Sequence, residues 1–538
     1  WDVENRLAGG FCDPLAHASM PGWYCAKVLT WDLHTTQFLA PAGVDLNNNY
    51  DSPFPLVLTC AFQSLGPHAQ FHIFAALEIL LILLTAWLVA RRLFPDRELW
   101  QIAYIGFAWW TGFYMARVHQ HYTLLAGIWG FQAMIWMALT LDWRNWKRMA
   151  GYGAVAGLVF VGTFHNIAML SVPFAILLGR SLWRAERNLK TLASVTVAGM
   201  TLCLTFFFFF GPSLLGYLAG DLPRAFGDRG LYNLDLASPL LPWMNSKLYE
   251  WFGVTSPLDF ERYNGLDLVV FALVVVAAVR RELLRLPLAK PLLAIALLSW
   301  LCSLGPEFRF WGQVLTTNPL ESLIGTLPPF GFSRTPARFF IVSVLALTFL
   351  AFAFLATRKL PAWLPLALIA WVALTGPALN GEWTVPTVEF RPIFPMQALG
   401  QIRSDQESKI VLTIPTALAS DPTHNFMQLF HQKPITSGYL AYTAHTPKAL
   451  AFMNSDPILS QMNCDGAIFA FRGDGIFTTP ELVRAHLIRT GIRYVIANKM
   501  LIAQPQCQKL MAWVQDLGRQ SWVRFVEENQ RFAVLQIQ

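Results

Sequence analysis

Two arginines four positions apart are the residues in this chain best suited to bind an anion. Arg334 and Arg338 flank Pro336, and proline is favoured in the first turn of a helix. Residues four apart lie on one face of a helix, so both guanidinium groups could point toward one phosphate. The amide groups of a helix N-terminus would add to such a site. The pattern predicts phosphate binding, and contact with lipid headgroups is the alternative.

Acidic residues near the start of the chain are candidates for a general base. They are Asp2, Glu4, Asp13, Asp32, Asp45 and Asp51. A carboxylate at a membrane boundary can deprotonate a hydroxyl nucleophile. We predict Asp2 for this role, because it lies nearest the expected boundary. The alternative for each acid is a cap of a helix or turn, which the proline after Asp51-Ser52 suggests there.

Polar residues in two further connections could contact a substrate. His119 and His121 lie in a short connection between apolar runs. Histidines two positions apart do not share a helix face, and no acid nearby completes a metal site. The pair is therefore interpreted as part of an interfacial polar turn, with substrate or phosphate binding as the alternative. Glu261 precedes another apolar run and leaves the same choice.

Membrane helices are the elements that would position these residues. Of the 538 residues, 55% are hydrophobic and 14% are charged, whereas a soluble protein carries about 25% charged residues. Ten apolar runs approach the length of about 20 residues that crosses a hydrocarbon core. We predict spans at 71–92, 99–117, 122–141, 150–164, 167–182, 191–212, 266–280, 290–304, 339–356 and 361–378.

Lys and Arg gather in every second connection between these runs. The basic connections are 91–97, 144–148, 180–190, 280–290 and 358–359. The positive-inside rule assigns such connections to the cytoplasm and the remaining segments to the opposite face. This orientation accounts for the net charge of +7, and no nucleic-acid motif occurs. Arg334 and Arg338 stand out because they lie on the face that the rule disfavours.

The predicted topology divides the chain into three parts. These are a first extracytoplasmic loop at 1–70, a transmembrane bundle at 71–378 with external loops at 213–265 and 305–338, and an extracytoplasmic domain at 379–538. In the last part, strands are predicted at 409–414 and 493–497, a helix at 481–489 and a hairpin at 522–537. The fold class is an α-helical polytopic membrane protein with a C-terminal soluble α/β domain. The N-terminus falls outside, which predicts one more helix upstream of Trp1.

Five of the seven cysteines fall on the predicted outer face. In an oxidising compartment they could pair as Cys12–Cys25 and Cys464–Cys507, and free thiols are the alternative. No Cys/His spacing of a structural zinc site occurs. The chain contains no Asn-x-Ser/Thr sequon, which favours a bacterial envelope over a eukaryotic secretory lumen.

Several short motifs, taken in their order, resemble one family of membrane enzymes. They are FLAPAGVDL at 38–46, NYDSP at 49–53, HQHYTL at 119–124, ERYNG at 261–265, LGP at 304–306, RTPARF at 334–339 and GIRYV at 491–495. Together they resemble bacterial polytopic glycosyltransferases of the GT-C superfamily. The resemblance covers most of 1–378, and the last motif fits the extracytoplasmic domains of these enzymes.

The resemblance implies an activity and its partners. Such enzymes move a sugar from a polyprenyl-phosphate donor to a hydroxyl of a glycan, lipid or protein acceptor, at the outer face of the bacterial inner membrane. An acid of the first loop acts as general base, here Asp2 with Asp13 in reserve. Arg334 and Arg338 would hold the leaving phosphate, with His119 or His121 nearby. The residues identify no cofactor, and a requirement for a divalent metal ion stays open.

Two other functions remain open from the sequence. A transporter or flippase for lipid-linked glycans would place ionisable residues or broken helices at mid-membrane. The span interiors are nearly free of charge, and Glu78 is the main exception. A non-catalytic partner in envelope polysaccharide assembly is the third reading, with the C-terminal domain as its docking module.

Overall fold

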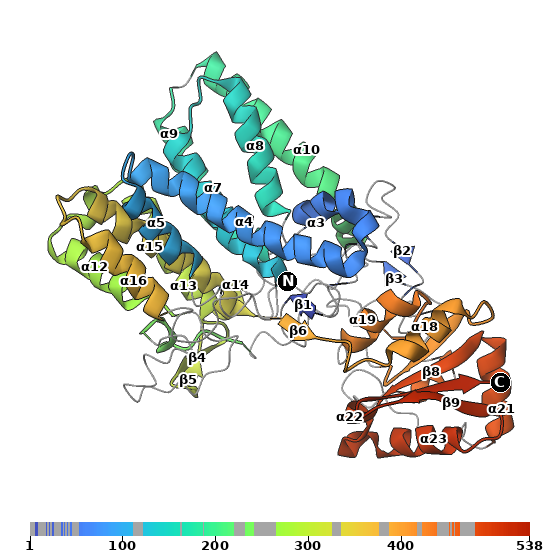
Figure 1. Ribbon diagram of the computed structural model, residues 1–538. Coiled ribbons are helices and arrows are strands. Elements are labelled where there is room, and N and C mark those ends of the chain that lie inside the picture. Colours follow the sequence, from blue (N-terminus) through green and yellow to red (C-terminus); the bar gives the residue numbers. More distant parts are fainter. Residues whose placement is uncertain are drawn as a thin grey trace.

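The computed structural model shows a helical bundle with a small α/β domain at one end (Figure 1). It describes residues 53–110, 122–161, 164–186, 188–219, 232–240, 265–324, 335–375, 387–416, 422–437 and 479–538, together with Tyr114 and short pieces of 6–45 and 451–462. The elements below are taken from these residues. This arrangement confirms the fold class predicted from the sequence.

A helix occupies each of the ten apolar runs predicted to span the membrane. These helices are α4 (Pro67–Leu93), α5 (Glu98–Trp109), α7 (Ala126–Thr140), α8 (Trp146–Phe160), α9 (Phe164–Arg184), α10 (Leu189–Ala219), α12 (Leu268–Val279), α13 (Ala289–Ser303), α15 (Phe340–Ala356) and α16 (Leu364–Thr375). Four stretches are long and apolar enough to cross a bilayer alone, namely Pro67–Leu93, Ile167–Arg184, Leu189–Gly211 and Pro336–Ala356. The protein is a multi-pass membrane protein.

Polar side chains fix where several of these helices begin. Asn145 precedes α8 and accepts a hydrogen bond from the Arg148 amide at 3.1 Å. Asn188 precedes α10 and accepts one from the Thr191 amide at 2.9 Å. Each bond satisfies an amide that has no partner within its own helix. Both caps lie in basic connections, so these connections have defined ends despite their charge.

The centre of the bundle is α15. Of the most apolar window in Pro336–Ala356, 89% is buried, because helices α5, α7, α12 and α13 surround it. The Phe352 ring lies 5.4 Å from the Tyr104 ring and 5.3 Å from the Phe107 ring, both from α5. Aromatic contacts of this kind stabilise a core that has no aqueous driving force within the membrane.

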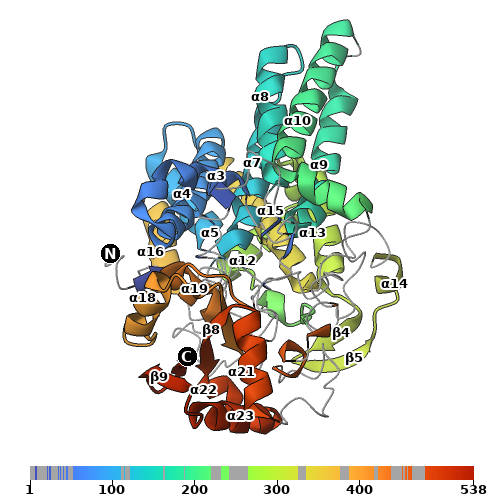
Figure 2. The ribbon, with the colours of Figure 1, turned by 90° about the vertical axis from the view of Figure 1, so that its right-hand side faces the viewer.

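Helices α8, α9 and α10 form an arm that projects from the rest of the bundle (Figure 2). Two glycines of α8 allow α10 to approach closely. A Cβ atom at Gly153 would lie 2.2 Å from the Ala198 carbonyl oxygen, and one at Gly157 would lie 2.9 Å from the Leu202 carbonyl oxygen. Small residues at this four-residue spacing are typical of tightly packed membrane helices.

The C-terminal domain is built on a four-stranded sheet with the order β7-β8-β10-β9. Its strands are β7 (Ile410–Ile414), β8 (Ile492–Asn498), β9 (Val523–Glu528) and β10 (Phe532–Ile537). Strands β7 and β8 are parallel, and the other pairs are antiparallel. Helices α18 (Met396–Ser404), α19 (Pro422–His431), α21 (Pro480–Arg489) and α23 (Gln508–Gly518) pack around it. The predicted strands, helix and hairpin therefore all occur.

Pieces of the first loop are joined to this domain by backbone hydrogen bonds. Strand β1 (Arg6–Ala8) pairs antiparallel with β6 (Thr387–Glu389). The amide of Ile435 donates to the Gln37 carbonyl at 2.8 Å, and the amide of Ala40 donates to the Ile435 carbonyl at 3.0 Å. Segments nearly 400 residues apart in the chain therefore form one structural unit.

One predicted disulfide is wrong. Cys25 is bonded to Cys60, with the two Cα atoms 5.3 Å apart, so it is not available to Cys12. The pairing was missed because Cys60 lies in a short helix, η2 (Cys60–Leu65), at the entrance to α4, and the fold of the first loop brings Cys25 to it. Cys507 is also disulfide-bonded, to a residue outside those described, so its pairing with Cys464 stays a prediction.

Candidate functional site

Only one of the residues predicted for the site lies within the described structure. That residue is Arg338. The other six fall outside the described residues, and their roles stay predictions. They are Asp2, Asp13, His119, His121, Glu261 and Arg334.

Arg338 lies at the start of the most buried helix of the bundle. It belongs to the short helix η8 (Pro336–Phe339), which continues directly into α15. Pro336 occupies the first turn, as the sequence predicted. The residue is only 6% exposed, although it carries a permanent charge. A buried guanidinium requires polar or anionic company, because desolvating a charge is costly.

The segment that carries Arg338 is held in place from two sides. The Ala337 amide donates to the Tyr232 carbonyl at 3.1 Å, and the Leu234 amide donates to the Ser303 carbonyl at 2.9 Å. On the other side, the Ser343 hydroxyl donates to the Ala296 carbonyl of α13 at 2.7 Å. Residues 232–236 thus bridge the start of α15 and the end of α13. Hydrogen bonds to residues 232–236 and to α13 therefore hold the segment around Arg338 in place.

A buried carboxylate, Asp235, organises the same end of the bundle. Its Oδ1 atom accepts hydrogen bonds from the amides of Ala237 at 2.8 Å and Trp311 at 3.0 Å. Its Oδ2 atom accepts one from the Gly312 amide at 2.7 Å. Trp311 and Gly312 form the turn of a hairpin and both have positive φ. Because a carboxylate is charged, these bonds are stronger than neutral ones and compensate for the strained turn.

The hairpin itself lies beside this carboxylate. It consists of β4 (Glu307–Phe310) and β5 (Gln313–Thr317). The Leu236 amide donates to the Arg309 carbonyl at 2.8 Å, so residues 232–236 also lie along β4. Arg309 forms an ion pair with Glu307 of the same strand. Figure 1 shows the hairpin at the same end of the bundle as the C-terminal domain.

An aromatic cluster closes the neighbouring ends of α4 and α5. The rings of Trp109 and Trp110 lie 4.4 Å apart, and that of Tyr114 lies 5.7 Å from the first and 5.6 Å from the second. The Tyr122 ring meets the Phe71 ring edge-on at 5.9 Å. These residues flank, in sequence, the connection that contains His119 and His121. Aromatic residues of this kind gather where a bundle meets the membrane interface.

The C-terminal domain faces this end of the bundle through α19. The Phe390 ring lies 5.0 Å from the Phe426 ring of α19 and 6.2 Å from the His68 ring of α4. Polar residues of α19 are also buried, among them Gln428 and His431. The Gln428 amide donates to the Gln37 side-chain carbonyl at 3.0 Å. Helix α19 therefore contacts the first loop as well as the aromatic residues that lie against α4.

His431 is neutral at physiological pH. Burial, reinforced by the nearby charges of His424 and Lys433, lowers the pKa of His431 to about 3. Its Nδ1 atom accepts a hydrogen bond from the Lys433 amide at 3.1 Å, which makes it the acceptor nitrogen of the ring. The residue stabilises the loop after α19 and is a residue of the fold.

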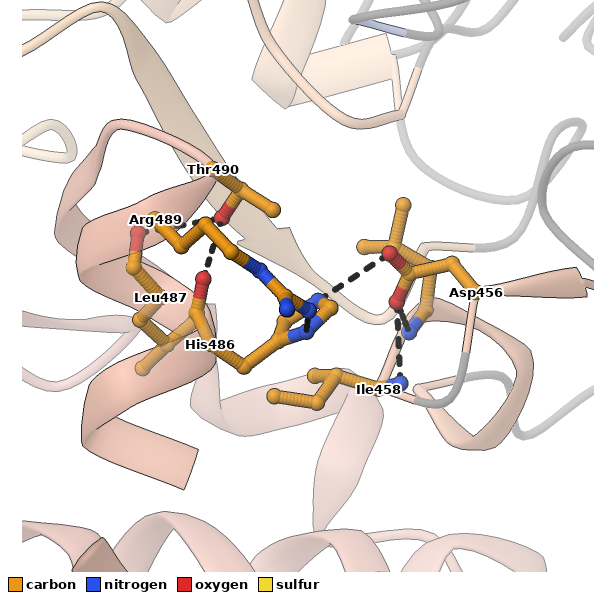
Figure 3. A network of polar contacts seen from close by, with 7 residues as sticks. Asp456, Ile458, His486, Leu487, Arg489 and Thr490 are labelled. Atoms are coloured by element: carbon orange, nitrogen blue, oxygen red, sulfur yellow. Dashed lines mark hydrogen bonds and ion pairs between the residues drawn. The ribbon is translucent and has the colours of Figure 1, made fainter. Parts of the chain in front are cut away.

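An Asp–His pair in the C-terminal domain resembles part of a catalytic triad in composition only (Figure 3). Asp456 lies 3.0 Å from His486 Nε2, and the Arg489 guanidinium lies 3.1 Å from His486 Nδ1. The guanidinium can only donate, so Nδ1 accepts, and the Nε2–H group donates a hydrogen bond to the Asp456 carboxylate. Both ring nitrogens therefore have partners within this cluster. Asp456 also caps the amides of Ile458 and Leu459, so the cluster links a loop to α21.

The described residues contain no group of three His, Cys, Asp or Glu side chains that could hold a metal ion. The described charged residues near Arg338 include the Glu307–Arg309 pair and Asp235. Of these, the carboxylate of Asp235 is occupied by backbone amides, and Arg309 is paired. Arg338 is a buried arginine at the start of the central helix, and a guanidinium at such a position can stabilise an anion.

Comparison with known families gives a match over residues 3–375, to the family described as "Domain of unknown function (DUF6311)". The chain belongs to this family. Its matched region contains the whole bundle and Arg338, whereas the C-terminal sheet lies beyond it. No curated protein sequence matches the chain.

Several solved structures resemble this chain in fold. The arabinofuranosyltransferase AftD from Mycobacteria superposes with a TM-score of 0.58 and 12% identity, over 99% of this chain and 38% of that one. ArnT from Cupriavidus metallidurans, solved bound to undecaprenyl phosphate, gives a TM-score of 0.46 and 14% identity, over 99% and 94% of the two chains. An oligosaccharyltransferase from Archaeoglobus fulgidus gives 0.45 and 12%, over 92% and 66%.

The likeness to AftD confirms the GT-C-like fold that the sequence motifs implied. This family member spans 38% of the length of that enzyme. Sequence reasoning proposed Arg338, whose role stays a prediction, and did not consider Asp235, which organises the same end of the bundle. The only sign of Asp235 in the sequence is its position two residues after Asn233 and three before Ser238-Pro239, a spacing common in turns.

Proposed function

We propose that the protein is a membrane glycosyltransferase that uses a polyprenyl-phosphate sugar as its donor. The observation that carries this proposal is a buried arginine, Arg338, at the start of the central helix of a GT-C-like bundle. An arginine there can stabilise the phosphate that leaves during sugar transfer. The acceptor is a hydroxyl of a glycan, lipid or protein.

The reaction is proposed to occur on the extracytoplasmic side of a bacterial inner membrane. Helix α4 supports this orientation, because its two ends differ in chemistry. Next to its first residue lies the Cys25–Cys60 disulfide, a bond that persists in oxidising compartments. Its last turn contains Arg91 and Arg92, as the positive-inside rule expects of a cytoplasmic end. The C-terminal domain lies at the disulfide end and is therefore proposed to be extracytoplasmic.

The proposed mechanism is a direct displacement at the anomeric carbon. Asp2, or Asp13 in its place, takes the proton of the acceptor hydroxyl. The acceptor oxygen bonds to the anomeric carbon as the bond from that carbon to the phosphate oxygen breaks. Polyprenyl phosphate leaves with the bonding electron pair, and Arg338 and Arg334 stabilise its charge.

Three further residues are proposed to bind the donor rather than to react. His119 and His121 would contact the phosphate from the connection beside the aromatic cluster. Glu261 would accept hydrogen bonds from sugar hydroxyls. A divalent metal ion bound to the phosphate would supplement the arginines, and dependence on it is measured by adding and removing a chelator.

The test measures release of polyprenyl phosphate from a radiolabelled donor by purified protein in lipid. We expect release to depend on the acceptor and to fall about a hundredfold in Arg338→Gln. The matched control is Arg358→Gln, because Arg358 lies just beyond the opposite end of α15 and pairs with Glu282. It should keep nearly full activity. Thermal unfolding of both variants shows that the loss is not one of folding.

The same assay decides between this proposal and its alternatives. Equal release by wild type and Arg338→Gln would remove Arg338 from the site. Movement of an intact lipid-linked glycan without release would favour a transporter. For that alternative, Glu78 is the residue to consider, but it is fully buried and accepts a hydrogen bond from Trp129 Nε1 at 2.8 Å. This hydrogen bond joins α4 to α7, so Glu78 is suited to holding the two helices together.

A further inference from the structure

An apolar pocket lies between α7, α8, α9 and α10, away from the end that carries Arg338. Its volume is about 150 Å³, and its lining includes Met134, Tyr152, Phe174, Leu178 and Leu202. Cavities of about this size with apolar walls stay dry and take up small apolar groups. The pocket is therefore suited to hydrocarbon rather than to water.

The two lining residues with polar side-chain groups use those groups outside the pocket. The Tyr152 hydroxyl donates to Thr140 Oγ1 at 2.8 Å. The Trp143 indole nitrogen donates to the Ser181 hydroxyl at 2.9 Å. The walls thus offer no hydrogen-bonding group to an occupant. A sugar or a peptide would lose its hydration there without compensation.

The pocket reaches the basic end of the projecting arm. Its lining includes Trp143 and Met149, which border the connection at 144–148, and Leu182, which precedes the connection to α10. Trp146 and Trp183 are exposed beside these connections. Exposed tryptophans next to basic residues are typical of the membrane–water interface. The pocket therefore extends from the interface into the apolar layer.

Positive charge is in excess around this mouth. The described basic residues there are Arg144, Lys147, Arg148, Arg180, Arg184 and Lys190, and the described acids are Asp142 and Glu186. Both acids are paired with arginines at exposed positions, where ion pairs are weak. Within the described part of the chain, Arg184 and Lys190 have no ion-pair partner. The mouth is complementary to a negatively charged headgroup.

We infer that this pocket binds one acyl chain of an anionic phospholipid from the same leaflet, with the lipid phosphate at the basic mouth. The inference is independent of the proposed sugar transfer, because that reaction is assigned to the opposite end of the bundle. The lipid would also complete the packing of the arm, since only 6% of the apolar window of Leu189–Gly211 is buried by protein.

The pocket can be filled by a single substitution. Gly199 of α10 lines it, and a Cβ atom at this position meets no atom within 4 Å. The Gly199→Phe side chain would start in open space beside the other lining residues, so it can narrow the pocket without displacing the backbone. Gly151→Phe is the matched control, because Gly151 also has open space at its Cβ but is not part of the lining.

The experiment uses the purified full chain, stripped of lipid and titrated with phosphatidylglycerol or phosphatidylcholine, with bound lipid counted by native mass spectrometry. Wild type should retain phosphatidylglycerol in preference to phosphatidylcholine. Gly199→Phe should weaken phosphatidylglycerol binding about tenfold, the effect of displacing two methylene groups. Removing the two unpaired charges in Arg184→Gln/Lys190→Gln should weaken it about fivefold per charge. Glycerophosphate, the headgroup without chains, should not bind.

Three results would overturn the inference. Gly199→Phe could bind as much phosphatidylglycerol as wild type, or Gly151→Phe could lose as much as Gly199→Phe. Equal retention of phosphatidylcholine by wild type would mean that the pocket is an unselective gap between helices. Sugar transfer by the variants is measured separately, so failure of the lipid site and failure of the proposed reaction are distinguishable.

Discussion

Replacing Asp235 by Asn should loosen the hairpin next to Arg338. The carboxylate accepts three backbone amide bonds, from Ala237, Trp311 and Gly312, at 2.7 to 3.0 Å. The amide group of Asn has only one oxygen, so its nitrogen must face at least one of these N–H groups. One buried donor loses its partner, and the remaining bonds lose the help of the negative charge.

The expected size of this effect follows from the burial of the site. Asp235 is fully buried, so water cannot replace the lost acceptor. An unsatisfied buried donor costs about 1–3 kcal/mol, and hydrogen bonds to a charged group contribute about 1.5–3 kcal/mol each. We expect local opening of residues 307–317 to become easier by about 2–3 kcal/mol. Amide hydrogen exchange there should then be about 30-fold to 150-fold faster.

The assay is hydrogen–deuterium exchange of the purified protein, followed by mass spectrometry of peptides from the hairpin. Asp142→Asn is the control, because Asp142 is exposed and accepts one amide bond, from Arg144 at 3.1 Å. It should leave exchange of the hairpin unchanged. Sugar transfer should fall with Asp235→Asn, since residues 232–236 also hold the segment of Arg338. Unchanged exchange in Asp235→Asn would refute the assignment of the turn to this carboxylate.

Three other changes test the packing of the bundle and of the C-terminal domain. Gly153→Ala should lower the thermal stability by about 1–3 kcal/mol, because its Cβ would lie 2.2 Å from the Ala198 carbonyl oxygen. Removing the disulfide in Cys25→Ala/Cys60→Ala should cost about 2–4 kcal/mol, since it closes a loop over a sequence separation of 35. The free energy of unfolding should fall as the pH drops from about 6.5 to about 3. In this range His431 becomes protonated in the unfolded chain, whereas it stays neutral in the folded protein, where its pKa is about 3. His431→Gln should flatten this decline, which is about 1.4 kcal/mol per pH unit.

Each of these predictions has a clear contrary result. Gly151→Ala, at an open helix position, should be neutral or stabilising, and a loss equal to that of Gly153→Ala would contradict the close packing of α8 and α10. Peptide mapping without reductant should recover Cys25 linked to Cys60. Recovery of Cys25 linked to another cysteine would contradict the described fold of the first loop. A pH profile that is the same in wild type and His431→Gln would assign the acid sensitivity to other groups.

The helices could be predicted from the sequence because each apolar run must satisfy its own backbone within a membrane. An apolar run as long as that of α4 or α10 satisfies its backbone hydrogen bonds within a membrane by forming a helix. The hairpin at 307–317 was missed for the opposite reason. Its strands are short, every residue of β5 is exposed, and the turn depends on Asp235, which lies 76 and 77 residues away along the chain. The sequence around it shows no periodicity that would reveal such a partner.

Arg338 was proposed from the sequence because the positive-inside rule disfavours an arginine at its predicted position, and its role in anion binding stays a prediction. A charge that the positive-inside rule disfavours needs a local reason, and that reasoning uses only the order of residues. The disulfide partner of Cys25 could not be found in this way. Spacing favoured the nearer Cys12, whereas the true partner depends on how the first loop folds back to the entrance of α4. Long-range contacts of this kind are set by tertiary packing, which local patterns do not encode.

The pairing of Gln37 with the C-terminal domain has a consequence for how the protein is made. Gln37 and Gln428 are separated by 391 positions. At a synthesis rate of roughly 5–20 residues per second, Gln428 is synthesised about 20–80 seconds after Gln37. During that time the unpaired backbone N–H and C=O groups around Gln37 can form hydrogen bonds with other segments. The Cys25–Cys60 disulfide, formed over a much shorter stretch, can confine this segment while the ribosome completes the chain.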